Sequence, residues 1–109
     1  MELKAKVWVE RRGRFVLGDG GVGLLEQIDR MGSIQAAARR LGWSYRHTWG
    51  YLKNLEDTSG TKFVERRHGG AAGGGAQLTP AGRTFVRRYR AFRGQVDRLI
   101  RSWNRRAAA

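Results

Sequence analysis

The sequence of 109 residues contains no cysteine, one proline and only two histidines. Without cysteine, disulfides, thiolate nucleophiles and cysteine-ligated zinc sites are excluded. The histidines, His47 and His68, belong to no catalytic or metal-binding motif, and acidic residues are sparse. The sequence also has no apolar run long enough for a membrane span or a signal peptide. We therefore expect a protein without enzymatic activity, metal or cofactor, located in the cytoplasm and not in a membrane.

The charge is strongly positive, with 22 Lys and Arg against 9 Asp and Glu and a formal net charge of +13. A folded domain tolerates such self-repulsion more easily when its partner is a polyanion. Most of the basic residues are arginines, which suit the recognition of phosphate and guanine. The length fits one domain. Nucleic acid is therefore the favoured partner, which would place the protein at the nucleoid, and an anionic membrane surface is the weaker alternative.

Two periodic stretches precede the centre of the chain. Residues 3–9 alternate between apolar and polar side chains, which is typical of a half-buried strand, and residues 15–17 are expected to return as the second strand of a hairpin. Trp8 falls on the polar face of this strand, where a partner subunit or the last helix would cover it. A helix with an apolar stripe follows, with Asp19 as its expected N-cap and Gly32 as its end.

Residues 33–56, SIQAAARRLGWSYRHTWGYLKNLE, are typical of two short helices joined by a tight turn. Ser33 is expected to cap the first helix, and Gly42 to end it in the left-handed conformation. Ser44 is expected to cap a second helix that runs through Leu55. The residues with the spacing of contacts between the two crossing helices are Ala37, Leu41, Thr48 and Leu52. This pattern predicts a helix-turn-helix, whose second helix can enter the DNA major groove.

A hairpin with a glycine-rich tip is expected directly after the second helix. Its strands are predicted at residues 62–67 and 76–79, with the tip at residues 68–75. A hairpin in this position is a wing. The prediction is therefore an α+β fold in which residues 1–79 form a winged helix-turn-helix, with the wing at about residues 62–79.

Residues 80–109 are predicted to form a long last helix, which belongs to the same domain and has Thr79 as N-cap and Pro80 in its first turn. Its large apolar residues are spaced 4, 3, 4, 3 and 4 apart, which defines an apolar seam of Phe85, Tyr89, Phe92, Val96, Leu99 and Trp103. Arginines dominate its other faces. The helix would be roughly 40 Å long, more than so small a domain needs for its own core. Dimerisation through the seam and Trp8 is favoured, and packing of the helix on its own domain is the alternative.

Several residues in and around the second helix are candidate DNA contacts. Arg46 is placed to reach a guanine edge or a phosphate, although a solvated surface arginine is the alternative. Trp49 could contact a thymine methyl group or belong to the core, and His47 could contact DNA or be half-buried. The full set of candidates is Ser33, Arg39, Ser44, Tyr45, Arg46, His47, Trp49, Lys53, Arg66, Arg67 and His68.

Two stretches, GSIQAAARRLGWSYRHTW and FVERRHGGAAGGGAQLTPAGR, resemble the N-terminal DNA-binding domain of the molybdate-responsive transcriptional regulators, the ModE family. Its winged helix is similar to that of LysR-type regulators. The resemblance implies a homodimer, joined through the N-terminal strands and the last helix, on a palindromic operator. It also implies that Tyr45, Arg46 and Trp49 belong to the recognition helix. Residues 66–75 take the role of the wing.

Members of the ModE family continue into molybdate-binding domains, whereas this sequence ends at Ala109. The resemblance therefore leaves three possibilities open: action without an effector, control by a separate effector-sensing protein, or a longer chain. The predicted function is a sequence-specific, homodimeric transcriptional regulator without an effector domain of its own. The alternatives are a nonspecific architectural DNA-binding protein and a protein-interaction module that recruits another regulator.

Overall fold

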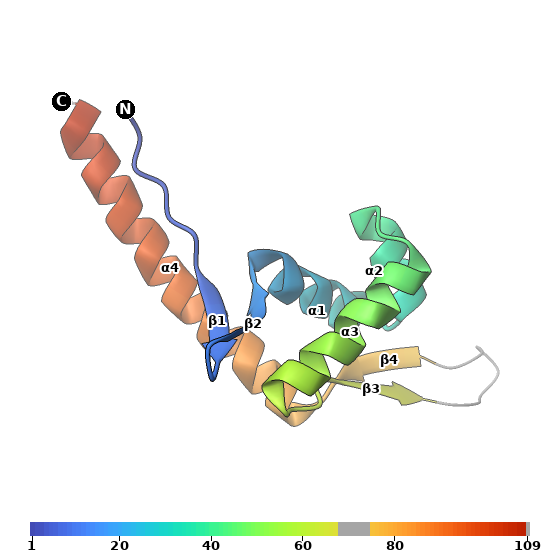
Figure 1. Cartoon of the computed structure of the whole chain (residues 1–109). Helices are drawn as coiled ribbons and strands as arrows, with labels where there is room; N and C mark the ends of the chain where they lie inside the picture. Colours follow the sequence, from blue (N-terminus) through green and yellow to red (C-terminus); the bar gives the residue numbers. More distant parts are fainter. Residues whose placement is uncertain (68–74, 109) are drawn as a thin grey trace.

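A computed structural model describes residues 1–67 and 75–108 of the chain. The elements are β1 (Trp8–Arg11), β2 (Arg14–Gly18), α1 (Asp19–Met31), α2 (Ile34–Leu41), α3 (Tyr45–Ser59), β3 (Val64–Arg67), β4 (Gly75–Leu78) and α4 (Pro80–Ala108). The β1–β2 hairpin and the β3–β4 wing are two separate antiparallel sheets. Figure 1 shows α4 projecting away from α2, α3 and the wing, with the N-terminal segment beside it. This arrangement is the predicted α+β winged helix-turn-helix.

The strand predicted over residues 3–9 is wrong for most of its length, since β1 begins only at Trp8. The preceding residues run beside α4 instead (Figure 1). The Leu3 amide donates to the side-chain oxygen of Asn104 at 2.8 Å, and the Asn104 amide nitrogen lies 3.3 Å from the Leu3 carbonyl oxygen. The side-chain amide of Asn104 on α4 thus takes the place of the neighbouring strand that the alternating pattern predicts as the hydrogen-bond partner of this backbone.

The predicted N-cap of α1 is also wrong. Gly18 holds the N-cap position, and Asp19 is the first residue of the helix. The Asp19 carboxylate accepts a hydrogen bond from the Tyr89 hydroxyl and lies 3.4 Å from Nε of Arg93, both on α4. Burial, reinforced by the hydrogen bond to Asp19, raises the pKa of Tyr89 to about 12. Tyr89 therefore remains a hydrogen-bond donor at neutral pH, and Asp19 links α1 to α4.

The predicted ends of the two helix-turn-helix elements follow local chemistry. The Ser33 and Ser44 hydroxyls accept hydrogen bonds from the amide three residues later, at 3.1 and 3.0 Å. Gly42 ends α2 in the left-handed conformation, with φ 73°. The predicted end of the second helix at Leu55 is wrong, because α3 runs one turn further to Ser59.

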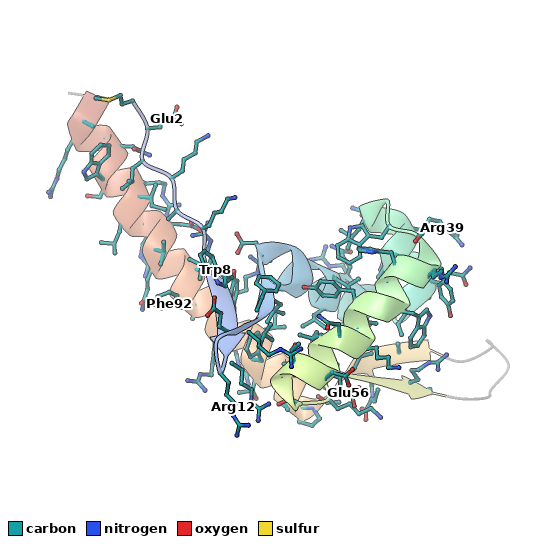
Figure 2. The ribbon with its side chains drawn as sticks, viewed as in Figure 1. Glu2, Trp8, Arg12, Arg39, Glu56 and Phe92 are labelled. Atoms are coloured by element: carbon teal, nitrogen blue, oxygen red, sulfur yellow. The ribbon has the colours of Figure 1, made fainter. Side chains whose placement is uncertain are left out.

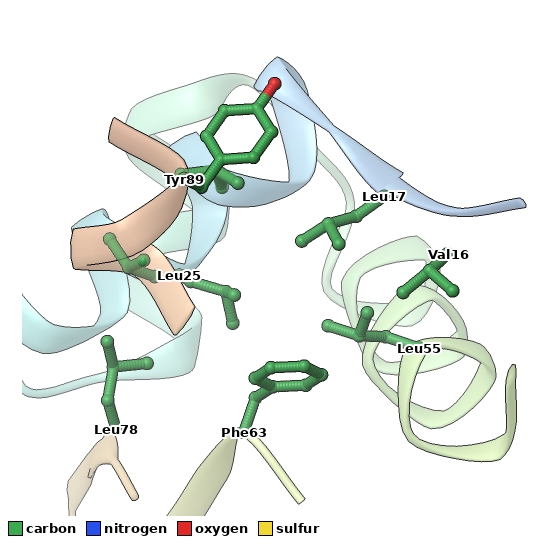
Figure 3. Packing of buried hydrophobic residues seen from close by; sticks show 9 residues of the cluster. Val16, Leu17, Leu25, Leu55, Phe63, Leu78 and Tyr89 are labelled. Carbon is green, nitrogen blue, oxygen red and sulfur yellow. The ribbon is translucent and has the colours of Figure 1, made fainter. Parts of the chain in front are cut away.

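Two buried clusters hold the elements together. The larger cluster, drawn in Figure 3, consists of Val16, Leu17, Val22, Leu25, Leu55, Phe63, Leu78, Val86 and Tyr89. The smaller consists of Leu24, Ile28, Ile34, Ala37 and Ala76. Fully burying one large aliphatic side chain stabilises a fold by about 1.5–3 kcal/mol. These clusters therefore fix α1, α3, the wing and the start of α4 against one another.

Three of the four contacts predicted between α2 and α3 lie at or near the core. Ala37 and Thr48 are fully buried, and the partly buried Leu52 packs against both clusters. The prediction for Leu41 is wrong, because its side chain is exposed. Leu41 is the last residue of α2, where Gly42 already turns the chain.

Candidate nucleic-acid interface

One side of α3 faces outward because the other side is held in the core. Thr48 is fully buried, and its hydroxyl donates to the Ser44 carbonyl at 2.8 Å. Leu55 is buried on the same side. The exposed residues of α3 include the candidates Tyr45, Arg46, His47 and Lys53. The outward side of α3 therefore combines two aromatic rings with two permanent positive charges.

Trp49 connects α3 with the wing. It is partly buried and packs against the smaller cluster. The Arg66 guanidinium of β3 lies 4.3 Å from the centre of the Trp49 ring, and the Tyr45 ring meets it edge-on at 5.9 Å. Such a cation–π contact contributes about 0.5–2 kcal/mol. It brings the charge of Arg66 to the outward side of α3.

Side-chain hydrogen bonds link the two strands of the wing. The Arg67 guanidinium donates to the Gln77 side-chain oxygen at 2.6 Å, and the Gln77 amide donates to Glu65 at 2.9 Å. These contacts cross between β3 and β4, whose paired residues run from Val64 with Leu78 to Arg67 with Gly75. Arg67 is exposed and oriented along the wing. The candidate His68 lies outside the described residues, as does most of the predicted tip.

The remaining candidates occupy the ends of α2 and α3. The Ser33 and Ser44 hydroxyls accept from their own helices, which leaves their hydroxyl hydrogens for an external acceptor. Arg39 is exposed in the last turn of α2, at the opposite end of the molecule from Phe92 in Figure 2. His47 is exposed and not half-buried, and its ring lies 4.9 Å from that of Trp43.

The apolar seam of α4 divides into two parts. Tyr89 is only 6% exposed, and the Phe85 ring meets the Phe63 ring edge-on at 5.2 Å, so both pack in the core of their own domain. The exposed part comprises Phe92 at 56%, Leu99 at 71% and Trp103 at 47%, with Val96 partly buried between them.

Trp8 and Phe92 are both exposed and line one open groove of 840 Å³ between β1 and α4 (Figure 2). The Trp8 indole nitrogen donates to Glu10 at 2.8 Å. The predicted covering of Trp8 by the last helix is therefore not found. Its covering by a partner subunit stays a prediction.

The outward side of α3 and the wing offers basic and aromatic side chains. Within residues 1–67 and 75–108, no three histidines or acidic residues are arranged to hold a metal ion. In the same ranges no helix has the length and apolar character needed to cross a membrane. What the arrangement can do chemically is bind an anion along α3 and the wing.

Comparisons with known proteins place this arrangement in a family. Residues 22–83, more than half of the chain, match the family described as bacterial regulatory helix-turn-helix protein, lysR family. The molybdenum-pterin-binding protein MopB of Rhodobacter capsulatus is 39% identical over 91% of this chain and 36% of its own length. The DNA-binding transcriptional dual regulator ModE of Escherichia coli is 37% identical over 62% of this chain and 26% of its own length. The chain thus spans about a third or less of these curated relatives.

Solved structures show the same fold. A complex of the CbnR DBD with DNA has a TM-score of 0.61 and 27% identity, covering 81% of this chain and 94% of that chain. A complex of the BenM DBD with catB site 1 DNA has a TM-score of 0.60 and covers 81% of this chain and 92% of that chain. At 20% identity, the BenM likeness concerns the fold alone. The chain therefore belongs to the lysR family of bacterial regulatory helix-turn-helix proteins, and its relatives include ModE of Escherichia coli, which is named as a DNA-binding transcriptional regulator.

Proposed function

We propose that this protein is a sequence-specific transcriptional regulator that binds a palindromic operator as a homodimer. One observation carries the proposal: the outward side of α3 and the wing strand β3 meet at the contact between Trp49 and Arg66. Through this contact, the second helix of the helix-turn-helix and the basic wing form one surface. The DNA complexes of CbnR, with which the chain shares its fold, support this role for the surface.

In this proposal the N-terminal half of α3 enters the major groove. Arg46 reaches a guanine edge, and Tyr45 contacts a thymine methyl group or the sugar-phosphate backbone. Arg66 and Arg67 follow the adjacent backbone or minor groove. The other proposed contacts hold phosphates and set the register of the protein on the duplex, and they are Ser33, Arg39, Ser44, His47, Trp49, Lys53 and His68.

The dimer contact in this proposal is the exposed part of the seam together with Trp8. Phe92, Leu99 and Trp103 are large apolar side chains grouped along one helix, which is rare on the surface of a soluble monomer. Tyr89 and Phe85 are left out, because their rings already serve the core. If this dimer reads half-sites one helical turn apart, its two α3 helices should lie about 34–36 Å apart.

We expect the Leu99→Asp variant to be a monomer in sedimentation equilibrium, whereas the wild type sediments as a dimer. A carboxylate in an apolar interface loses its hydration without gaining a partner. The matched control is Ala91→Asp, which adds the same charge at another exposed position of α4. Circular dichroism verifies that both variants remain helical.

A monomeric wild type, or equal dissociation of both variants, would contradict the dimer. A stable homodimer also disfavours the protein-interaction module, since the seam is then already occupied. The names of two relatives connect them with molybdenum. For this chain we propose DNA recognition through α3 and the wing.

A further inference from the structure

The face of α4 opposite the seam carries arginines in two parallel lines. At about 100° per residue, intervals of 7 and 11 residues return to nearly the same side of a helix. One line with these intervals is Arg83, Arg90 and Arg101, and the neighbouring line is Arg87, Arg98 and Arg105. Both lines lie roughly half a turn from Phe92 and Trp103. A dimer formed through the seam would therefore leave this face open.

The chain itself neutralises the part of this face that lies beside α1. The Arg83 guanidinium lies 3.4 Å from the Asp29 carboxylate, and the Arg90 guanidinium lies 2.6 Å from that of Glu26. Both carboxylates belong to α1. Acidic residues of α1 thus neutralise the first two arginines of one line, where α1 is within reach.

Beyond α1 the same face is bare. Arg98, Arg101 and Arg105, which we call the distal arginines, are exposed. In the part of the chain that the structure describes, none of the three is in an ion pair. The single acidic residue of α4, Asp97, pairs with Arg93 at 3.5 Å. The distal half of α4 therefore presents positive charge with no internal counterpart.

The spacing of the distal arginines makes them repel one another. Like charges three or four residues apart on a helix destabilise it by about 0.2–0.5 kcal/mol per pair. An external polyanion would remove this cost and gain charge-assisted hydrogen bonds. All nine basic residues of α4 are arginines, whose planar guanidinium suits bidentate contact with phosphate.

We propose that the distal arginines bind the phosphate backbone of a second DNA duplex, so that the protein bridges its operator to another DNA segment. From Arg98 to Arg105 the distal arginines extend along α4 for about 10 Å. A straight line of charge matches the regular charge of a duplex, about one per 1.7 Å, better than the patchy surface of an acidic protein. Figure 1 shows the distal part of α4 projecting away from α3 and the wing, so the DNA held by α3 does not lie along it. The inference rests on the proposed DNA-binding function of α3.

A bridging assay tests this inference with the full chain. An operator duplex is fixed to beads, and capture of a free labelled duplex of unrelated sequence is measured. We expect the wild type to capture the second duplex, and the combined variant Arg98→Gln/Arg101→Gln to capture at least about fivefold less, because two phosphate contacts are lost. The variant should bind the operator itself within about twofold of the wild type.

The matched control is Arg12→Gln/Arg14→Gln, which removes the same charge from the exposed β1–β2 hairpin and should still bridge. Absence of bridging by the wild type, or bridging by the α4 variant equal to that of the wild type, would overturn the inference. If the two α3 helices of a dimer held the two duplexes, the α4 variant would bridge as well as the wild type. A wild type that fails to bind the operator would instead count against the proposed function.

Discussion

The Arg46→Ala variant should bind the operator about 1–3 kcal/mol more weakly than the wild type, a loss of roughly 5- to 150-fold. Binding to random DNA should change little. Arg46 is exposed in the first turn of α3, on the side opposite the buried Thr48. Removal of the Arg46 side chain takes no buried contact from the domain. The loss of operator affinity therefore reflects the lost contact with a base. Fluorescence anisotropy on operator and random duplexes, at one salt concentration, measures both quantities.

Lys53→Ala provides the contrast on the same helix. Lys53 is exposed two turns further along α3, where we propose a phosphate contact. Its loss should weaken operator and random binding by similar factors and reduce the salt slope by about 1. If Arg46→Ala instead weakens binding to both duplexes equally, Arg46 is a phosphate contact and not a base reader.

The Gly82→Ala variant should be destabilised by about 3 kcal/mol, the upper end of what overpacking costs. Gly82 is buried in the first turn of α4, and its amide donates to the Thr79 hydroxyl at 3.0 Å. A β-carbon there would collide with the backbone carbonyl of Phe63, at the start of the wing. A backbone atom has no rotamer by which to move aside, so α4 or the wing must shift. Urea unfolding followed by circular dichroism measures the change.

Gly50→Ala is the matched control for this prediction. Gly50 is an exposed residue within α3, and a β-carbon there would meet no described atom within 4 Å. Because alanine favours a helix, this variant should be as stable as the wild type or up to about 1 kcal/mol more stable. Equal stability of the Gly82 and Gly50 variants would show that the close approach of α4 to the wing is not required.

The parts of the fold that sequence predicts well depend on neighbouring residues. Ser33, Gly42 and Ser44 take their predicted capping positions, because an N-cap or a left-handed glycine is determined by chemistry within one turn. The Thr79–Pro80 start of α4 is confirmed for the same reason, since the Thr79 hydroxyl accepts from the first turn. The order of helices, hairpin and wing follows from these boundaries.

The parts that sequence misses depend on contacts between distant residues. Asp19 has the chemistry of a cap, but Tyr89 on α4 binds its carboxylate. The contact between Trp49 and Arg66 crosses from α3 to β3, and no periodicity connects the two positions. The alternating pattern of residues 3–9 also cannot show that α4 replaces a neighbouring strand.

The seam shows a similar limit. Its heptad spacing correctly places the apolar residues on one side of α4, but it does not determine what covers each of them. Tyr89 is buried because α1 and the N-terminal segment reach it. Leu99 and Trp103 lie beyond the rest of the core and remain exposed. The sequence predicts a dimer contact along the whole seam, whereas the structure packs the first part of the seam in the domain itself.

The central claim is that two copies of this chain read a palindrome through α3. Selection of bound sequences from random DNA with the wild-type chain tests it most directly. The expected result is a two-fold symmetric motif with half-sites about 10 base pairs apart, centre to centre. Recovery of unrelated sequences without a common motif, or of a single unrepeated half-site, would contradict it.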